Sequence, residues 1–331
     1  MSDQLLHHGG ALDLVKAMFP DAPEPWLDLS TGINPHAYPF DPPSKEAITH
    51  LPTRSAFEKC KAVMARVYGA PTKAILPTPG SEIVIRLLPT LLQGEKIAVP
   101  LPTYGDHVEV WQNAGRQVVQ VSNPLETTDN ADIVIVCNPN NPDGRRWSVE
   151  ELRRCALQIA QQGKWLIVDE AYADLAPDQS VAHLAGQPGL IVLRSIGKFY
   201  GLAGLRLGAV LAPQEVLQSL EELLGVWAVS GPALEVGARA LDDDEWAKQT
   251  RQNLNNMRNS VDTVLDHAGM KVFGGTDLFR YVEVADAEQV WRRLAEQGIY
   301  VRPFSWSDKH LRIGLPKCEA ELQRLARALS L

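Results

Sequence analysis

The residues whose types and spacing best suit a chemical reaction lie between Ile191 and Leu211, where Lys198 is the only lysine between two apolar runs. Lysine is normally exposed, so its place among aromatic and apolar neighbours is unusual for a surface loop. Partial burial would favour the neutral amine, which can attack a carbonyl carbon. Ser195 and Arg206 flank this lysine, and a hydroxyl with a forked cation suits one phosphate group. An amine beside residues that bind a phosphate predicts a binding site for pyridoxal phosphate.

Three other interpretations of this stretch are open. Ser195 and Lys198 spell the S-x-x-K of penicillin-recognising enzymes, but the chain has neither an S-D-N nor a K-T-G string. The spacing of Gly201, Gly204 and Gly208 differs from the G-x-G-x-x-G of a dinucleotide-binding turn. The plainest alternative is a strand–loop–strand segment whose lysine extends its amine into solvent. The choice therefore depends on which residues the rest of the chain brings to this lysine.

The segment from residue 74 to residue 211 alternates short apolar runs, typical of buried strands, with helical patterns. Such alternation predicts an α/β fold with a doubly wound, mostly parallel sheet. In such sheets, ligands bind at the carboxyl ends of the strands. The polar residues expected at those ends are Tyr104, Asn141, Asp169 and Lys198. Their coincidence favours a cofactor lysine over a surface lysine.

Two further features of this segment concern charge. Gly80 and Ser81 precede an apolar helical pattern, and the start of a helix leaves backbone N–H groups able to bind an anion. Most helices begin in this way without a ligand, so the pattern alone does not define a site. Asp169 and Glu170 directly follow an apolar run, where two carboxylates are costly unless one has a cationic partner. The sequence therefore predicts a buried cation near them.

Changes of pattern along the chain predict three segments. Residues 1–44 form an N-terminal arm and part of a smaller domain, residues 45–230 a large cofactor-binding domain, and residues 231–331 a small α+β C-terminal domain. In the last segment we expect one long helix from Pro232 to His267. Two strands, Leu278–Val284 and His310–Gly314, should enclose a helix at residues 287–297.

The totals of the 331-residue chain exclude several classes of function. A net charge of -8 without a basic run argues against a nucleic-acid partner. No apolar stretch approaches the ~20 residues of a membrane span, and the first ten residues lack the pattern of a signal peptide. The four cysteines are scattered, without metal or disulfide spacing. We therefore expect a cytoplasmic protein with reduced thiols, no metal site and no membrane partner.

Three motifs resemble those of the class I/II aminotransferase superfamily, the fold-type I pyridoxal phosphate enzymes. They are Asn138-Pro-Asn-Asn-Pro-Asp-Gly144, Val168-Asp-Glu-Ala-Tyr172 and the run from Ser195 to Gly208. The likeness covers nearly the whole chain, and it implies a large doubly wound domain with a smaller α+β domain. It also implies a homodimer, because the sites of this family lie at the subunit interface.

The resemblance implies roles for single residues, of which Lys198, Asp169 and Tyr172 would be catalytic. Lys198 would be the Schiff-base lysine, and Asp169 would pair with the pyridinium nitrogen. Asn141 and Tyr172 would hydrogen-bond the phenolic oxygen, and Tyr104 would stack on the ring. An aspartate beside the ring nitrogen keeps it protonated, so that electrons from a broken bond at Cα flow into the ring. The cofactor phosphate would be held by Gly80, Ser81, Glu82, Ser195 and Arg206.

One branch of the superfamily is similar in its N-terminal segment. His8-Gly-Gly, followed by Leu27-Asp-Leu-Ser-Thr-Gly-Ile-Asn-Pro35, resembles threonine-phosphate decarboxylases and their CobC-type relatives in cobalamin biosynthesis. The resemblance implies decarboxylation of L-threonine O-3-phosphate to (R)-1-amino-2-propanol O-2-phosphate. The side chains implied for the substrate phosphate and carboxylate are His8, Asn34, Arg302 and Arg312. For Arg302 the alternative is a plain surface cation.

Other activities and two departures from the family pattern stay open at this point. Transamination, as in histidinol-phosphate aminotransferases, is the alternative activity, since both reactions share every cofactor residue. A non-catalytic binding protein that keeps the fold is a further alternative, although such proteins usually carry a DNA-binding domain. Leu51-Pro52 stands where a tyrosine of the family often reaches the partner subunit's cofactor phosphate. Asp143 replaces the usual threonine of the Asn-Pro-Thr-Gly ending.

Overall fold

The computed structural model describes residues 8–330, so residues 1–7 of the expected N-terminal arm lie outside the described residues. The chain divides into two compact units. The larger unit comprises residues 37–141 and 145–246. The smaller unit comprises the residues up to His36, residues 142–144 and the residues from Ala247 onward.

These boundaries differ from the breaks expected after residues 44 and 230. Helix α9 (Gly231–Leu241) packs against α3 (Lys45–Thr49) and α4 (Arg54–Tyr68), so the larger unit continues beyond residue 230. The division falls inside α10 (Asp244–His267), which has no break in its sequence pattern at that point. The domain bounds drawn from the sequence stay a prediction.

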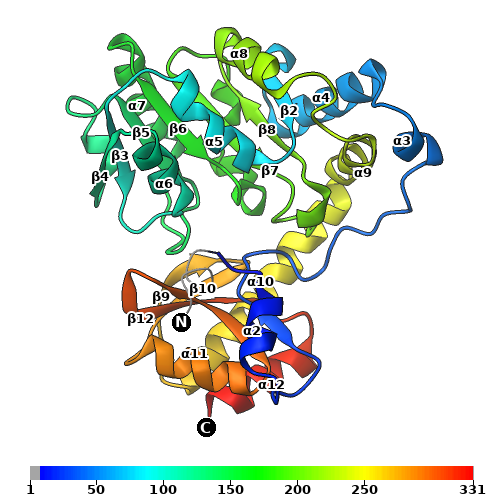
Figure 1. Ribbon diagram of the computed structural model, residues 1–331, viewed down its shortest axis with the longest axis vertical. Coiled ribbons are helices and arrows are strands. Elements are labelled where there is room, and N and C mark those ends of the chain that lie inside the picture. Colours follow the sequence, from blue (N-terminus) through cyan, green and yellow to red (C-terminus); the bar gives the residue numbers. More distant parts are fainter. Residues whose placement is uncertain (1–7, 331) are drawn as a thin grey trace. The chain divides into compact units, whose positions relative to one another are not determined.

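A seven-stranded sheet forms the centre of the larger unit (Figure 1), in the order β2-β8-β7-β6-β5-β3-β4. Neighbours from β4 to β7 are parallel, whereas β8 runs antiparallel to both β2 and β7. This confirms the predicted α/β fold with a mostly parallel sheet. The strands are β2 (Ile75–Thr78), β3 (Lys96–Pro100), β4 (Gln117–Val121), β5 (Ile133–Cys137), β6 (Trp165–Asp169), β7 (Leu190–Ser195) and β8 (Gly208–Leu211).

Apolar side chains on both faces of these strands explain why helices pack on the sheet. Ile135, Ile167 and Ile191 join one buried cluster with residues of α5, α6 and α8, while Val136 and Val168, which point the other way, are buried as well. Helix α7 packs against β6, and α4 packs against β2. The bounds of these helices are α5 (Ser81–Leu91), α6 (Asp106–Asn113), α7 (Val149–Gln161) and α8 (Gln214–Leu224).

Capping side chains set the helix ends in this unit. Ser148 caps α7: its hydroxyl accepts from the Glu151 N–H at 3.2 Å, and the Glu151 carboxylate accepts from the Ser148 N–H at 2.8 Å. The chain from Ser44 to Tyr68 forms two helices, α3 and α4, because Pro52 cannot continue an α-helix. Thr53 then caps α4.

The smaller unit contains a five-stranded sheet in the order β1-β11-β12-β10-β9 (Figure 1). Strand β1 pairs in parallel with β11, and the other pairs are antiparallel. The strands are β1 (Leu27–Leu29), β9 (Lys271–Thr276), β10 (Phe279–Glu283), β11 (Ile299–Phe304) and β12 (Ser307–Gly314). The helices are α2 (Leu12–Met18), α11 (Ala287–Glu296), α12 (Glu319–Leu329) and most of α10.

The structure differs from the expectation for this part of the chain in two ways. Strands β9 and β11 were not predicted from the sequence pattern. The helix expected from Pro232 to His267 is divided into α9 and α10 at Asp242 and Asp243. The Asp243 carboxylate accepts from the Trp246 N–H at 2.9 Å, an N-terminal cap that starts a new helix.

Within residues 8–330, none of the helices combines the length and the apolar character needed to cross a bilayer.

Candidate active site

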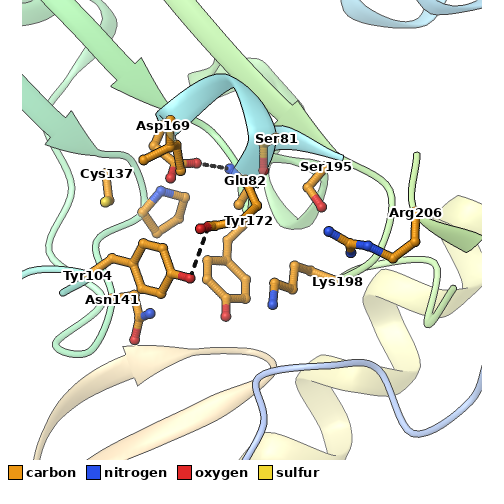
Figure 2. A pocket seen from close by; sticks show the side chains of 13 residues that line it. Ser81, Glu82, Tyr104, Cys137, Asn141, Asp169, Tyr172, Ser195, Lys198 and Arg206 are labelled. Carbon is orange, nitrogen blue, oxygen red and sulfur yellow. Dashed lines mark hydrogen bonds between the residues drawn. The ribbon is translucent and has the colours of Figure 1, made fainter. Parts of the chain in front are cut away.

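A pocket opens at the carboxyl ends of β5, β6 and β7, with Lys198 in its wall (Figure 2). Its volume of about 190 Å³ is several times the roughly 30 Å³ share of one water molecule in the liquid. It can therefore admit more than isolated solvent. The predicted cofactor residues that line it are Ser81, Glu82, Tyr104, Asn141, Asp169, Tyr172, Ser195, Lys198 and Arg206. Gly80, the remaining one, directly precedes this lining.

Ser195, Lys198 and Arg206 lie on one side of the pocket (Figure 2). Two glycines allow the backbone to close around them. Gly80 has a φ of +85°, and a Cβ there would come within 2.8 Å of Arg206 Nη2. A Cβ on Gly208 would lie 2.8 Å from the backbone nitrogen of Ser81, at the start of α5. The helix start and the guanidinium thus form a concave cationic surface suited to a phosphate.

Asp169, at the end of β6, lies on the opposite side of the pocket (Figure 2). Its Oδ1 accepts from the Ala171 N–H at 3.0 Å, and its Oδ2 lies 2.9 Å from His107 Nε2. These two contacts fix the direction of a carboxylate that is only 6% exposed. The pocket therefore has a carboxylate on one side and an amine with a guanidinium on the other. That polarity fits a ligand with a basic nitrogen and a phosphate at opposite ends.

His107 is a part of this site to which the sequence assigned no role. It is fully buried in α6, and its ring nitrogen lies within 4.8 Å of donor atoms of both Cys137 and Asp169. Burial works to lower the pKa of His107, but the neighbouring Cys137 and Asp169 outweigh it and raise the pKa to about 10. The raised pKa favours the protonated form of the ring that faces Asp169. Because histidine, thiolate and carboxylate are also metal ligands, the expected absence of a metal site stays a prediction.

Tyr104 reaches the pocket from the loop after β3. Its hydroxyl donates to Asp106 Oδ2 at 2.6 Å and lies 3.3 Å from Glu82 Oε2. Burial, together with these carboxylates, raises the pKa of Tyr104, so the phenol stays neutral. Burial and the charge of Asp106 also raise the pKa of Glu82, whose Oε1 lies 2.7 Å from Arg86 Nε. The Glu82 side chain is thus engaged with its neighbours, which leaves its backbone for the predicted phosphate contact.

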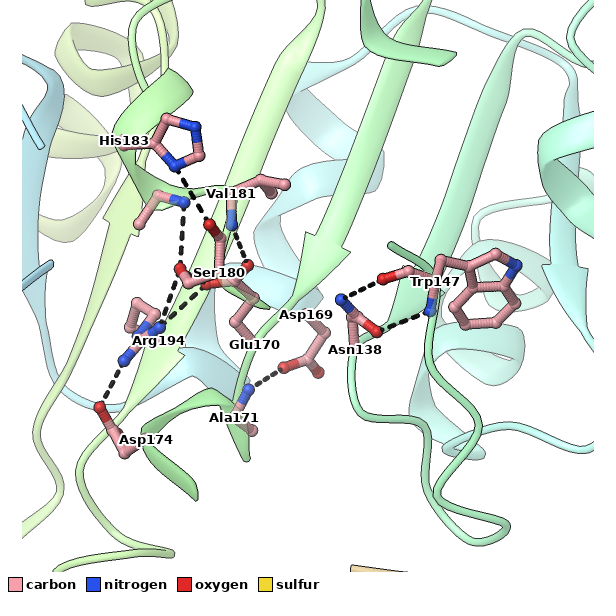
Figure 3. Close-up of polar contacts among 11 residues, drawn as sticks. Asn138, Trp147, Asp169, Glu170, Ala171, Asp174, Ser180, Val181, His183 and Arg194 are labelled. Atoms are coloured by element: carbon pink, nitrogen blue, oxygen red, sulfur yellow. Dashed lines mark hydrogen bonds and ion pairs between the residues drawn. The ribbon is translucent and has the colours of Figure 1, made fainter. Parts of the chain in front are cut away.

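Asn141 and Tyr172 reach the pocket from two neighbouring loops (Figure 2). The loop that carries Asn141 is closed at its base by Asn138. The Asn138 side chain accepts from the Trp147 N–H at 3.0 Å and donates to the Trp147 carbonyl at 3.1 Å (Figure 3). Tyr172 follows β6 by three residues and is buried. The structure thus brings both predicted ring-oxygen donors to the same pocket.

A buried ion network joins the segment after Asp169 to strand β7, which leads into the lysine loop (Figure 3). Arg194, which is 2% exposed, places its Nη1 2.9 Å from Glu170 Oε2 and pairs through Nη2 with Asp174. The Ser180 hydroxyl donates to the same Glu170 oxygen at 2.5 Å. Arg194 is thus the cationic partner of Glu170, and His107 is the partner of Asp169. These are the buried cations that the sequence predicts near the two carboxylates.

Comparison with known proteins decides the family. A family model described as aminotransferase class I and II matches residues 44–329. The chain belongs to the class I and II aminotransferase family. This confirms the resemblance drawn from the three sequence motifs, and pyridoxal phosphate is accordingly the cofactor. The pocket brings together the residues predicted to bind it.

Within this family, the chain is similar to two threonine-phosphate decarboxylases. It is 41% identical to that of a Sinorhizobium species over 325 residues, which is 98% of this chain and 97% of the relative. It is 37% identical to that of Pseudomonas aeruginosa over 329 residues, again 98% and 97% of the two chains. Among solved structures, the histidinol-phosphate aminotransferase of Sinorhizobium meliloti in complex with pyridoxal-5'-phosphate shares the fold. Its TM-score is 0.77 at 20% identity, over 96% of this chain and 93% of that one.

The residues predicted to bind substrate belong to the smaller unit: His8, Asn34, Arg302 and Arg312. Arg302 and Arg312 are both 7% exposed and face each other in the register of β11 and β12. This burial excludes the alternative of a plain surface cation for Arg302. Asn34 is buried, and its Oδ1 accepts from the His36 N–H at 2.9 Å, whereas His8 is exposed.

The His107–Asp169 contact predicts how the stability of this protein changes with pH. The pKa of His107 rises from 6.5 to about 10 on folding, so its charge stabilises the fold fully below pH 6.5, and that contribution is lost as the pH rises through 10. Urea unfolding of the cofactor-free protein should therefore show the largest difference between wild type and His107→Gln at low pH. The difference should shrink with rising pH, and a difference independent of pH would contradict this assignment. In an Asp169→Asn background the pH-dependent part should fall.

Proposed function

We propose that this protein is a pyridoxal phosphate-dependent threonine-phosphate decarboxylase. It converts L-threonine O-3-phosphate to (R)-1-amino-2-propanol O-2-phosphate, a reaction that serves cobalamin biosynthesis. The observation that carries the proposal is the 41% identity to a threonine-phosphate decarboxylase over 98% of this chain. The buried arginine pair of the smaller unit supports it, since the substrate has two anionic groups.

The pocket of the larger unit fits the cofactor. Side-chain atoms at Gly80 and Gly208 would fill the concave surface beside Arg206 and the start of α5, and both positions are glycine. Ser81, Ser195 and Arg206 would hold the cofactor phosphate there, and the Lys198 amine would hold the cofactor aldehyde covalently. When bound, pyridoxal phosphate supplies a sink for the electron pair released as a bond to the substrate Cα breaks.

The other polar residues of the pocket would tune and orient this sink. Asp169, held by His107 and by a backbone N–H, would face the ring nitrogen and keep its proton in place. Asn141 and Tyr172 would donate to the phenolic oxygen. Tyr104, kept neutral by the two carboxylates near its hydroxyl, would support the ring by stacking. Orientation matters because it decides which bond at Cα is broken.

Lys198 would also handle the proton at the substrate Cα. In decarboxylation the bond between Cα and the carboxylate breaks, carbon dioxide leaves, and one proton is added at Cα. An amine that has been displaced by the substrate amine stays near that carbon on its flexible stem and can deliver the proton. No acid or base from the smaller unit is needed for this step.

The smaller unit would bind the substrate's anionic groups. Arg302 and Arg312 offer two buried guanidinium groups on adjacent strands, and planar guanidinium forks match both carboxylate and phosphate. Phe304 and Phe279 lie 5.6 Å and 5.1 Å from these guanidinium carbons and restrict their rotation. His8 and Asn34 would add neutral or cationic donors. A substrate held at two anionic groups has few orientations left.

The alternative activity is amino transfer from a phosphorylated compound such as histidinol phosphate, because the cofactor residues serve both reactions. Purified protein should be incubated with L-threonine O-3-phosphate, and both carbon dioxide and 1-amino-2-propanol O-2-phosphate should be measured. We expect the two products in equal amounts without any keto acid. Amino transfer that depends on an added keto acid, without release of carbon dioxide, would refute the proposal.

We further propose that the protein acts in the cytoplasm as a homodimer. Ile48 and Leu51 of the larger unit are 64% and 62% exposed, and a second copy of the chain would cover such apolar side chains. Leu51 has no hydroxyl with which to reach the cofactor of the partner. The cofactor phosphate would therefore receive no contact from residue 51 of the partner subunit and would be held by donors of its own chain.

A further inference from the structure

Ser30 is the point at which three segments of the smaller unit meet. It follows β1 and is completely buried. Its backbone N–H and its hydroxyl both donate to Asp28 Oδ1, at 2.8 Å and 2.6 Å. Because the single hydroxyl proton is directed to Asp28, the hydroxyl oxygen is left to act as an acceptor.

Residues 8–10, the described start of the N-terminal arm, contact this hydroxyl. The Gly10 N–H donates to Ser30 Oγ at 2.8 Å. Gly9 lies against the Ser30 backbone so closely that a Cβ would be 2.3 Å from the Ser30 carbonyl oxygen and 3.1 Å from its Oγ. Only glycine can approach a backbone oxygen to this extent. Ser30 therefore fixes the position of the arm that carries His8.

The carbonyl oxygen of Ser30 holds a different segment. It accepts from Arg312 Nη2 at 2.6 Å, inside the buried part of β12. A fixed acceptor on one Nη limits the rotation of the planar guanidinium, which has its donors in a rigid fork. One buried serine thus contacts the arm through its side chain and the substrate arginine through its backbone.

We propose that Ser30 is a positioning residue for substrate binding, which fixes the arm carrying His8 relative to the guanidinium of Arg312. This rests on the proposed function, in which both residues bind the anionic groups of the substrate. Ser30 lies in the smaller unit, whereas the predicted cofactor residues belong to the larger one. Its removal should therefore change substrate affinity and leave cofactor affinity unaltered.

The test compares variants of the holoenzyme with L-threonine O-3-phosphate as substrate. Ser30→Ala removes the acceptor of the Gly10 N–H and should raise KM about tenfold, with kcat within about twofold of wild type. The affinity of the cofactor-free protein for pyridoxal phosphate should not change. Gly9→Ala displaces the same arm sterically and should act in the same direction. Ser148→Ala, which removes an exposed capping hydroxyl of α7 in the larger unit, is the control for loss of a serine hydroxyl elsewhere and should leave KM unchanged.

A double-mutant cycle shows whether Ser30 acts through the arm. His8→Ala alone should raise KM, and adding Ser30→Ala to it should have little further effect. Fully additive effects, or a loss of kcat and cofactor affinity at constant KM, would overturn the proposal. Should Ser30→Ala fail to fold, Gly9→Ala takes its place in the cycle. If His8→Ala leaves KM unchanged, both the proposed role of His8 and this inference are refuted. If His8→Ala raises KM but Ser30→Ala does not, only the inference about Ser30 is refuted.

Discussion

Replacing Lys198 with alanine should lower the turnover of L-threonine O-3-phosphate by about 10⁴-fold or more, because one amine holds the cofactor and moves the proton. The fold should persist, since Lys198 is half-buried while the neighbouring Phe199 and Tyr200 make the buried contacts of the loop. Release of carbon dioxide measures the rate. Borohydride reduction followed by peptide mapping should find the cofactor on Lys198 in the wild type and on no lysine of the variant.

Lys164 offers a matched control for this experiment. It is also a half-buried lysine of the larger unit, and its Nζ donates to the Thr128 carbonyl at 2.8 Å. Lys164→Ala should keep the turnover and the visible colour of the bound cofactor. A fully active Lys198→Ala variant, or an adduct mapped to another lysine, would refute the assignment of the amine.

The largest loss of stability is expected from Arg194→Met. The change leaves the carboxylates of Glu170 and Asp174 buried without their cation, and breaking a buried ion pair from one side costs about 3–5 kcal/mol. Burial raises the pKa of Glu170 even with Arg194 present. When folding raises the pKa of a carboxyl, the protein becomes less stable as the pH rises above the ordinary pKa of that group, which is 4.5 for Glu170. The deficit of the variant should therefore grow from that pH towards neutrality in urea-unfolding experiments.

Two further variants test the cause of this loss. Adding Glu170→Gln and Asp174→Asn to Arg194→Met should recover much of the stability, since no buried charge is left uncompensated. Arg66 also pairs with two carboxylates, Asp242 and Asp244, but at the surface. Surface ion pairs contribute about 0–1 kcal/mol, so Arg66→Met should have a small effect. An equal loss in both arginine variants would contradict the importance of burial.

The ends of the parallel strands were the part of the site that could be predicted from local pattern. Apolar runs of about five residues fixed where β5, β6 and β7 stop, and the polar residues that follow them, such as Asn141 and Asp169, then had to meet at one edge of the sheet. The structure places these residues in one pocket with Lys198. The prediction succeeded because position along a strand is a local property.

The partners of the buried charges could not be predicted in the same way. The sequence required a cation near Asp169 and Glu170 but did not identify it. Asp169 pairs with His107, 62 residues away, and Glu170 with Arg194, 24 residues away. Such pairs depend on the register between strands and helices, which no local pattern encodes. His107 therefore stood in the sequence as an unassigned residue three positions after Tyr104.

The smaller sheet was less predictable for a related reason. The short strand β1 can be recognised from its apolar pattern, but its partner β11 lies about 270 residues later in the chain and cannot. Strand β11 contains two buried polar residues, Tyr300 and Arg302, which weaken the apolar signal of a strand. The sequence motif around Asn34 could be linked to substrate binding only through family resemblance. The contacts of Ser30 with Gly10 and Arg312 join segments that are distant in the chain.

The reversed direction of β8 limits how this protein can evolve or be engineered. Ser195 at the end of β7 pairs with Gly208 at the start of β8, so both ends of the hairpin loop at residues 196–207 are fixed by the sheet. Lys198 and Arg206 both lie in this closed loop. Inserting or deleting one residue would displace them relative to each other by up to about 3.5 Å, which exceeds the tolerance of a hydrogen bond. The loop can therefore exchange side chains, but its length is constrained.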